Sequence, residues 1–252
     1  MDLGLKGRVA LVAGGTRGLG FAVARALAAE DCAVAVCGRD PDRLEDAVVA
    51  LGSAGNAPVY GRIVDVTDEA AVEGWVADVV HELGALHIVV TNAGGPPPGP
   101  VTDFSTADFR AAHDVAVAPH IALALAALPQ LRAAGWGRVL MIASETVRQP
   151  IPGYGLSSTV RPALLGFART LATAVAPDGI TVNVLAPGYH DTDGLRSHAD
   201  EETLRAVAAA IPVGRLGQPS DFGAVAAFLS GEPAAFITGT TLLVDGGATR
   251  GI

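Results

Sequence analysis

Seven short runs of apolar and β-branched residues, separated by longer alanine-rich segments, are the feature that most constrains the fold of this chain. The runs cover residues 8–13, 33–37, 59–64, 86–91, 138–143, 180–186 and 241–245. Their almost continuous apolarity is typical of parallel strands that helices cover on both faces. The segments between them predict helices over 18–29, 41–51, 68–83, 106–134, 157–176 and 220–230. Asp40-Pro41 is typical of an N-cap followed by proline in the first helical turn.

This alternation predicts one α/β domain over residues 1–252, a doubly wound parallel sheet of about seven strands with right-handed crossovers. In such a sheet, ligands bind beyond the carboxyl ends of the strands. The Gly/Pro-rich stretches 94–100 and 188–194 follow the fourth and sixth strands, so both are expected to border the site. The region around 188–212 is long enough to serve as a lid.

Charge indicates which classes of partner are excluded, and the two cysteines indicate the redox environment. Seventeen Lys and Arg stand against 26 Asp and Glu, a net charge of −9, without any basic cluster. This balance argues against nucleic acid and against an anionic membrane surface. No uninterrupted apolar stretch approaches ~18 residues, and the first residues lack an export-signal pattern. Cys32 and Cys37 lie too far apart along one strand for a disulfide and point to opposite faces, which is expected of free thiols in the cytoplasm.

The first strand runs into a glycine-rich turn that opens the first helix. Gly14, Gly18 and Gly20 permit a tight turn and a close backbone approach, and the helix N-terminus offers N–H groups to a phosphate. The segment therefore predicts binding of a dinucleotide pyrophosphate. The residues expected to form this cradle are Gly14, Thr16, Arg17, Gly18, Leu19 and Gly20.

The GxxxGxG spacing resembles that of the short-chain dehydrogenase/reductase family, and further motifs follow in the family's order along essentially the whole chain. These are Asp65-Val66, Asn92-Ala93-Gly94, the stretch from Pro187-Gly188 to Thr192, Arg215-Leu216-Gly217-Gln218-Pro219, and Val244-Asp245-Gly246-Gly247. The resemblance implies adenine contacts at Asp65 and Val66, and nicotinamide contacts in the loop from Pro187 to Thr192.

The residues after the second strand bear on the choice of nicotinamide cofactor. An NAD enzyme usually places an acidic side chain there, on the ribose 2′-hydroxyl. This chain has Arg39, whose guanidinium can pair with a 2′-phosphate, and Arg17 lies in the glycine turn. Asp40 could accept from the ribose instead, but helix capping is the favoured reading. The sequence thus favours NADP(H), with NAD(H) as the alternative.

The catalytic positions depart from the family's usual Asn, Ser, Tyr and Lys. The resemblance places Ser144 at the serine, aligns Ser157 with the tyrosine and Arg161 with the lysine, and puts Ala116 where the asparagine belongs. A serine hydroxyl is a far weaker acid than a phenol, and arginine keeps its proton. Arg161 is expected to bind the nicotinamide ribose, but the usual tyrosine-driven reduction cannot run unchanged.

Two other tyrosines are candidates for the proton donor. Tyr154 lies seven residues before Arg161, a spacing that resembles the enoyl-thioester reductases of the same superfamily, and Tyr189 lies in the loop after the sixth strand. Glu145, beside Ser144, is expected to be solvated. Spacing suited to a metal site is absent.

Three functions remain open. The leading one is an NADP(H)-dependent oxidoreductase of a small carbonyl or alcohol with an altered proton relay. The second is reduction of a conjugated C=C bond, and the third is nucleotide binding without turnover, as in a sensor or scaffold. The resemblance and the apolar helices expected over 106–134 and 157–176 predict a homodimer or homotetramer.

Overall fold

The structure, a computed structural model that describes residues 1–250, is built on one seven-stranded parallel sheet. Its strands are β1 (Val9–Val12), β2 (Ala33–Gly38), β3 (Val59–Ile63), β4 (Ile88–Asn92), β5 (Gly137–Ile142), β6 (Ile180–Pro187) and β7 (Thr241–Val244). They lie in the order β3-β2-β1-β4-β5-β6-β7, and the order reverses between β1 and β4. The predicted doubly wound α/β fold is confirmed.

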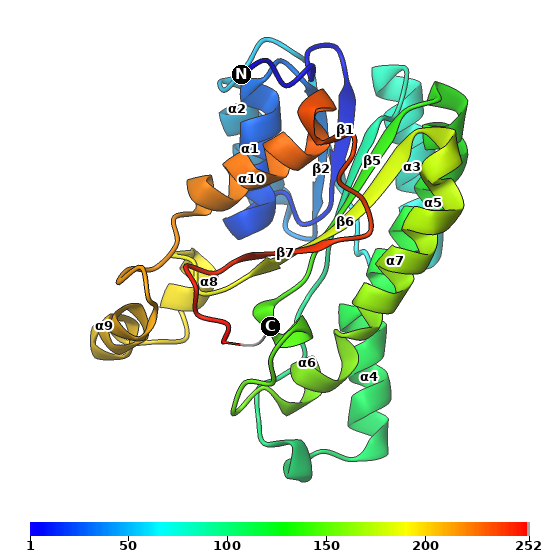
Figure 1. The fold of residues 1–252 in the computed structure, drawn as a ribbon. Helices are drawn as coiled ribbons and strands as arrows, with labels where there is room; N and C mark the ends of the chain where they lie inside the picture. Colours follow the sequence, from blue (N-terminus) through cyan, green and yellow to red (C-terminus); the bar gives the residue numbers. More distant parts are fainter. Residues whose placement is uncertain (251–252) are drawn as a thin grey trace.

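Helices cover both faces of this sheet, with α1, α2 and α10 on one face and α3, α5 and α7 on the other (Figure 1). The helices are α1 (Gly18–Ala29), α2 (Pro41–Gly52), α3 (Glu69–Leu83), α4 (Thr106–Ala116), α5 (Ala118–Ala134), α6 (Gly155–Val160), α7 (Ala163–Val175), α8 (Asp193–Arg196), α9 (Glu201–Ala210) and α10 (Pro219–Ser230). Short 3-10 turns occupy Val101–Asp103, Glu145–Val147, Ala176–Asp178 and Glu232–Ala234. Helices α4, α6, α8 and α9 lie beyond the carboxyl ends of the strands (Figure 1).

Two apolar cores, one on each face of the sheet, hold the layers together. Alternate residues of one strand point into different cores because side chains alternate across a sheet. Thus Leu11 of β1 packs with α3, α5 and α7, whereas Val12 packs with α1, α2 and α10. Cys32 and Cys37 likewise belong to opposite cores, and both are free thiols, as predicted.

The predicted helix over 106–134 is wrong as a single element. Val117 interrupts it with φ −129° and ψ −55°, which separates α4 from α5. The cause is Pro119 in the first turn of α5, since proline lacks the N–H that would continue the helical hydrogen bonds. The combined stretch Thr106–Ala134 is long and apolar enough to span a membrane by length and composition alone, yet half of its most apolar window is buried in the protein.

The predicted helix over 157–176 is also divided. It begins two residues earlier, as α6, and is interrupted at Arg161 and Pro162 before α7 begins. The proline again removes a helical N–H. Arg161 and Pro162 keep right-handed helical φ and ψ values, so the division breaks the helical hydrogen bonding without reversing the chain.

Candidate functional site

A cleft of about 1140 Å³ lies along the carboxyl ends of the strands. It is lined by the turn after β1, the ends of β2, β3 and β4, and the loop after β6. The predicted cofactor residues that line it are Gly14, Thr16, Arg17, Gly18, Leu19, Arg39, Asp65, Val66, Asn92, Ala93, Gly94, Pro187, Gly188 and Thr192. Residues that are up to 178 positions apart in the sequence therefore surround one space.

The glycine turn leaves room for an anion where side chains would otherwise stand. Gly14 has φ +58°, and a Cβ there would lie 2.8 Å from the side-chain nitrogen of Asn92. Gly20 does not line the cleft; a Cβ on it would lie 2.3 Å from the carbonyl oxygen of Gly14, so this glycine lets α1 pack closely against the turn. Arg17 is the N-cap of α1 in an extended conformation, without a side-chain cap. The first N–H groups of α1 are thus free for a phosphate, and the site fits a dinucleotide.

Three arginines lie around the end of the cleft nearest β2. Arg17 and Arg39 were expected there, and Arg43 of α2 lines the same surface, which the sequence did not indicate. The side chain of Arg39 is 78% exposed, with a guanidinium nitrogen 3.7 Å from the Asp65 carboxylate. Asp40 accepts from the backbone N–H of Arg43 at 3.2 Å, and its carboxylate also pairs with the Arg43 side chain. The helix-capping interpretation of Asp40 is confirmed.

At the other end of the cleft, Arg161 contacts the loop after β4. Its side chain is buried, and its Nη2 donates a hydrogen bond to the carbonyl oxygen of Gly94 at 3.1 Å. Burial lowers the pKa of Arg161 to about 10, and no carboxylate offsets this shift among residues 1–250. Arg161 does not itself line the cleft, but it carries a fixed positive charge behind the loop that does.

The two serines form a hydrogen-bonded group with Thr146. The hydroxyl oxygen of Ser144 accepts from the backbone N–H of Thr146 at 3.2 Å, and the hydroxyls of Ser157 and Thr146 lie 3.0 Å apart. Ser157 is buried, whereas Ser144 is half-buried. Neither lines the cleft wall. Ser157 therefore has its hydrogen-bond partner within the protein.

Both candidate tyrosines lie on the same side of the site, but only Tyr189 lines the cleft. Tyr154 precedes α6 and is 40% exposed. The two side chains interact: burial, followed by the charge and hydrogen bond of Tyr154, raises the pKa of Tyr189 to about 12. Tyr189 is thus the candidate tyrosine that lines the cleft, and Tyr154 lies near it.

The expectation that Glu145 is solvated is wrong. Its side chain is buried because the 3-10 turn Glu145–Val147 packs against β6, under the loop that begins at Gly188. Burial and then the charge of Asp245 raise the pKa of Glu145 to about 7. These neighbours lie 35 or more residues farther along the chain, so the local sequence contains no signal of this burial.

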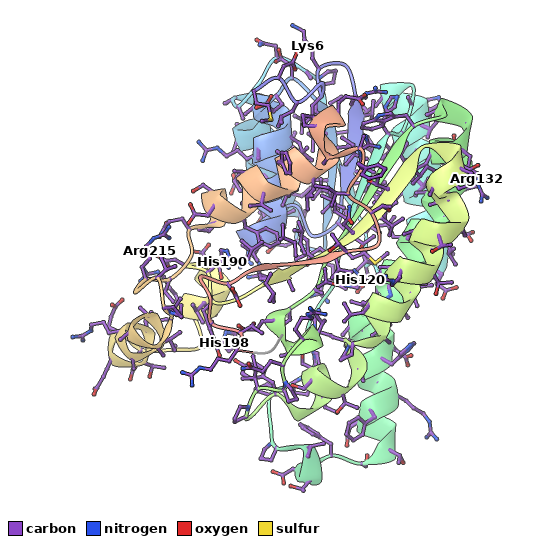
Figure 2. The ribbon with its side chains drawn as sticks, viewed as in Figure 1. Lys6, His120, Arg132, His190, His198 and Arg215 are labelled. Carbon is purple, nitrogen blue, oxygen red and sulfur yellow. The ribbon has the colours of Figure 1, made fainter. Side chains whose placement is uncertain are left out.

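His120 is a second buried polar residue that the sequence analysis did not single out. One ring nitrogen lies 2.6 Å from the Thr91 hydroxyl at the end of β4, and the other has no partner within residues 1–250. Burial, followed by the charge of Arg161, lowers the pKa of His120 to about 3, so the ring is neutral. Figure 2 shows His120 and His190 near the carboxyl ends of the strands. No group of three or more metal-ligating side chains forms within residues 1–250.

The parallel sheet, the glycine turn and the cleft define a dinucleotide-binding oxidoreductase fold. A family model described as Enoyl-(Acyl carrier protein) reductase matches residues 13–249. Dehydrogenase/reductase SDR family member 4 of Homo sapiens is 34% identical over 96% of this chain and 88% of its own length. 3-oxoacyl-[acyl-carrier-protein] reductase FabG of Escherichia coli is 31% identical over 97% of this chain and 98% of its own. The chain belongs to the short-chain dehydrogenase/reductase family and is an oxidoreductase of that type.

A solved structure shows the same architecture throughout. L-sorbose reductase from Gluconobacter frateurii, solved with NADPH and L-sorbose, covers 100% of both chains with a TM-score of 0.95 at 29% identity. The similarity includes the cleft region, because no part of either chain is left outside the comparison. The fold predicted from the sequence is therefore the fold of a reductase that was solved with NADPH bound.

Proposed function

We propose that the chain is an NADP(H)-dependent reductase that acts on a small carbonyl compound, or on the corresponding alcohol in reverse, with a proton relay different from the family's usual one. The observation that carries this proposal is the distribution of charged and hydrogen-bonding groups along the cleft. One end is surrounded by arginines, and the middle is a glycine turn with free N–H groups. Toward the other end, Tyr189 lines the cleft and Arg161 lies buried behind the loop at Gly94.

The arginine-rich end supports NADP(H) over NAD(H). The last residue of β2 is Gly38, and the next side chain is Arg39, so no carboxylate stands at the end of that strand. The carboxylate nearest to that strand end in the sequence belongs to Asp40, and it caps α2 by accepting a hydrogen bond from the backbone N–H of Arg43. Arg17, Arg39 and Arg43 can donate to a 2′-phosphate, which suits a guanidinium fork. The NADPH bound to L-sorbose reductase is consistent with this preference.

The residues at the opposite end have separable roles in the proposed reaction. When bound, the nicotinamide supplies the hydride. Arg161 hydrogen-bonds the loop after β4 and contributes a permanent positive charge behind it, which favours the negatively charged cofactor. We assign to Ser144 the hydroxyl that donates to the substrate oxygen, because it follows β5 beside the cleft, although its side chain does not line the cleft wall. Tyr189, which does line the cleft and has Tyr154 near it, is assigned the supply of the proton. Ser157 has no acid role, because its hydroxyl is committed to Thr146.

Cofactor titration tests the nucleotide assignment. NADPH and NADH are titrated by fluorescence against the wild-type protein and Arg39→Ala, with Arg25→Ala, an exposed arginine of α1, as the matched control. A charge-assisted hydrogen bond contributes about 1.5–3 kcal/mol. Because Arg39 is exposed and already lies near Asp65, the lower value applies, and Arg39→Ala should weaken NADPH binding roughly tenfold. Equal affinity for both cofactors would contradict the assignment.

A second reaction class, reduction of a conjugated C=C bond, is supported by the Enoyl-(Acyl carrier protein) reductase description of the matching family model and by the serine at position 157. Separate panels of ketones and enones, each assayed by NADPH oxidation, distinguish the two. Oxidation only with enones would favour the second reaction. Tight NADPH binding without oxidation on either panel would favour a nucleotide-binding sensor or scaffold.

A further inference from the structure

We propose that His190 is a positioning residue for the reduction, and that its ring fixes the loop after β6 so that the phenol of Tyr189, the preceding residue, stays in the cleft. This inference rests on the proposed function, in which Tyr189 supplies the proton. His190 lines the same cleft as Tyr189, although its side chain is only 5% exposed.

The first observation is a hydrogen bond that spans Tyr189. The Nδ1 atom of His190 lies 3.0 Å from the backbone carbonyl oxygen of Gly188. A carbonyl oxygen only accepts, so Nδ1 carries a proton and donates this hydrogen bond. The backbone N–H of Gly188 in turn donates to the carbonyl oxygen of Val244, the last residue of β7, at 3.0 Å. The residue before Tyr189 is therefore held both by the His190 ring and by the sheet.

The second observation is that the residues on either side of His190 bind one glycine of another segment. Gly217 lies two residues before α10, and its backbone N–H donates to the carbonyl oxygen of Tyr189 at 3.0 Å. The carbonyl oxygen of Gly217 accepts from the backbone N–H of Asp191 at 2.8 Å. His190 and Gly217 thus form an isolated parallel bridge. The backbone is anchored immediately before and immediately after His190.

The packing of the His190 ring is the third observation. A Cβ on Gly217 would lie 2.7 Å from Cδ2 of His190 and 2.8 Å from its Nε2, so the ring occupies space that a side chain at position 217 would fill. The ring also contacts Phe222, a fully buried residue of α10, with ring centroids 5.5 Å apart and planes at 83°. Such an edge-to-face contact is favourable. Figure 2 shows His190 near the start of α10, and the two contacts fix the plane of its ring.

These contacts determine where the Tyr189 side chain can point. Tyr189 lies between Gly188 and His190, which are joined by the Nδ1 hydrogen bond, and its own carbonyl oxygen is bound by Gly217. A residue held on both sides has few backbone conformations, so its phenol is preorganised for proton transfer. The proton leaves the Tyr189 hydroxyl, and His190 exchanges none in this step. His190 acts only on the position of the donor.

Two variants separate the hydrogen bond of His190 from the bulk of its ring. His190→Asn keeps a side-chain N–H group near the position of Nδ1, whereas His190→Leu fills similar space without a donor. Because a misplaced proton donor is a poor catalyst, His190→Leu should lower kcat for reduction roughly tenfold or more, and His190→Asn should stay within about threefold of the wild type. His81→Leu, at a histidine of α3 whose side chain is 83% exposed, is the matched control and should leave kcat unchanged. Wild-type activity in His190→Leu, or equal losses in both His190 variants, would overturn the proposal.

A double variant distinguishes the positioning of Tyr189 from a general structural defect. His190→Leu/Tyr189→Phe should be no slower than Tyr189→Phe alone, because the hydroxyl that His190 positions is already absent. A further loss of kcat in the double variant would show that His190 affects turnover by another route, and the proposal would be wrong.

Hydrogen exchange of the cofactor-free protein tests the anchoring of the loop without turnover. The backbone N–H groups of Asp191 and Gly217 are both hydrogen-bonded within the bridge. Their exchange, followed by mass spectrometry, should be roughly tenfold faster in His190→Leu than in the wild type or His190→Asn, because local opening of the loop becomes easier. If no ketone or enone is reduced, the proposed function fails, yet these rates still decide whether His190 fixes the loop. Unchanged exchange in His190→Leu would refute that role.

Discussion

Replacing Arg161 should make the folded protein more stable and its cofactor binding weaker. The guanidinium is buried without a carboxylate partner in residues 1–250, and burial shifts its pKa from 12.5 to about 10. One pKa unit corresponds to about 1.4 kcal/mol, so this shift amounts to about 3 kcal/mol against the charged form. A buried, uncompensated charge therefore destabilises the cofactor-free fold.

In Arg161→Met this penalty disappears, and only the hydrogen bond to the Gly94 carbonyl is lost. Since that bond contributes about 1.5 kcal/mol or more, the free energy of unfolding should rise by about 1–2 kcal/mol. For a chain of this length that is about 2–8 °C in Tm, which calorimetry measures. NADPH affinity should fall roughly tenfold or more, because the cation behind the Gly94 loop is gone.

Two control variants test whether the effects of Arg161→Met come from the loss of its buried charge. Arg161→Lys retains the charge and should give no increase in Tm, whereas Arg169→Met, at an exposed position of α7, should change neither quantity. An Arg161→Met protein that is less stable than wild type and binds NADPH equally well would refute the reasoning, because both effects would then have the wrong sign.

Five further outcomes are expected. Tyr189→Phe, which removes the hydroxyl of the tyrosine that lines the cleft, should lower turnover by about 10²–10⁴-fold with little change in cofactor affinity. Ser157→Ala should mainly lower the unfolding free energy, by about 1–3 kcal/mol, because the Thr146 hydroxyl loses its partner; a larger loss of turnover in Ser157→Ala than in Tyr189→Phe would contradict this assignment. Gly20→Ala should weaken NADPH binding, measured by titration, because its Cβ would meet the Gly14 carbonyl at 2.3 Å. Burial raises the pKa of Cys32 and Cys37 to about 12, so neither should react with a thiol reagent at pH 8 until the protein unfolds. Light scattering should give a multiple of 25.4 kDa, and a monomer at micromolar concentration would contradict the expected oligomer.

The sequence by itself determined the layered architecture, because hydrophobic periodicity is a local property of each segment. Apolar runs such as 180–186 are buried on both faces, and the alternation of strands with helices admits few arrangements other than a doubly wound sheet. The glycine turn could also be predicted from the sequence, because Gly14 adopts a positive φ that few other residues tolerate. Pro119 and Pro162, which divide two of the predicted helices, are also present in the sequence, so these divisions could have been predicted from it.

Only the tertiary structure decided the chemical character of the side chains at the end of the cleft near Gly94 and Gly188. The ionisation of Glu145 depends on Gly188 and Asp245, and that of Arg161 on the loop at Gly94, all of them distant in sequence. Whether Tyr154 or Tyr189 faces the cleft likewise depends on how separate loops meet. A pKa is set by burial and by neighbouring charges, which a local pattern does not contain. For this reason the fold follows from the order of the segments, whereas the proposed proton relay depends on their packing.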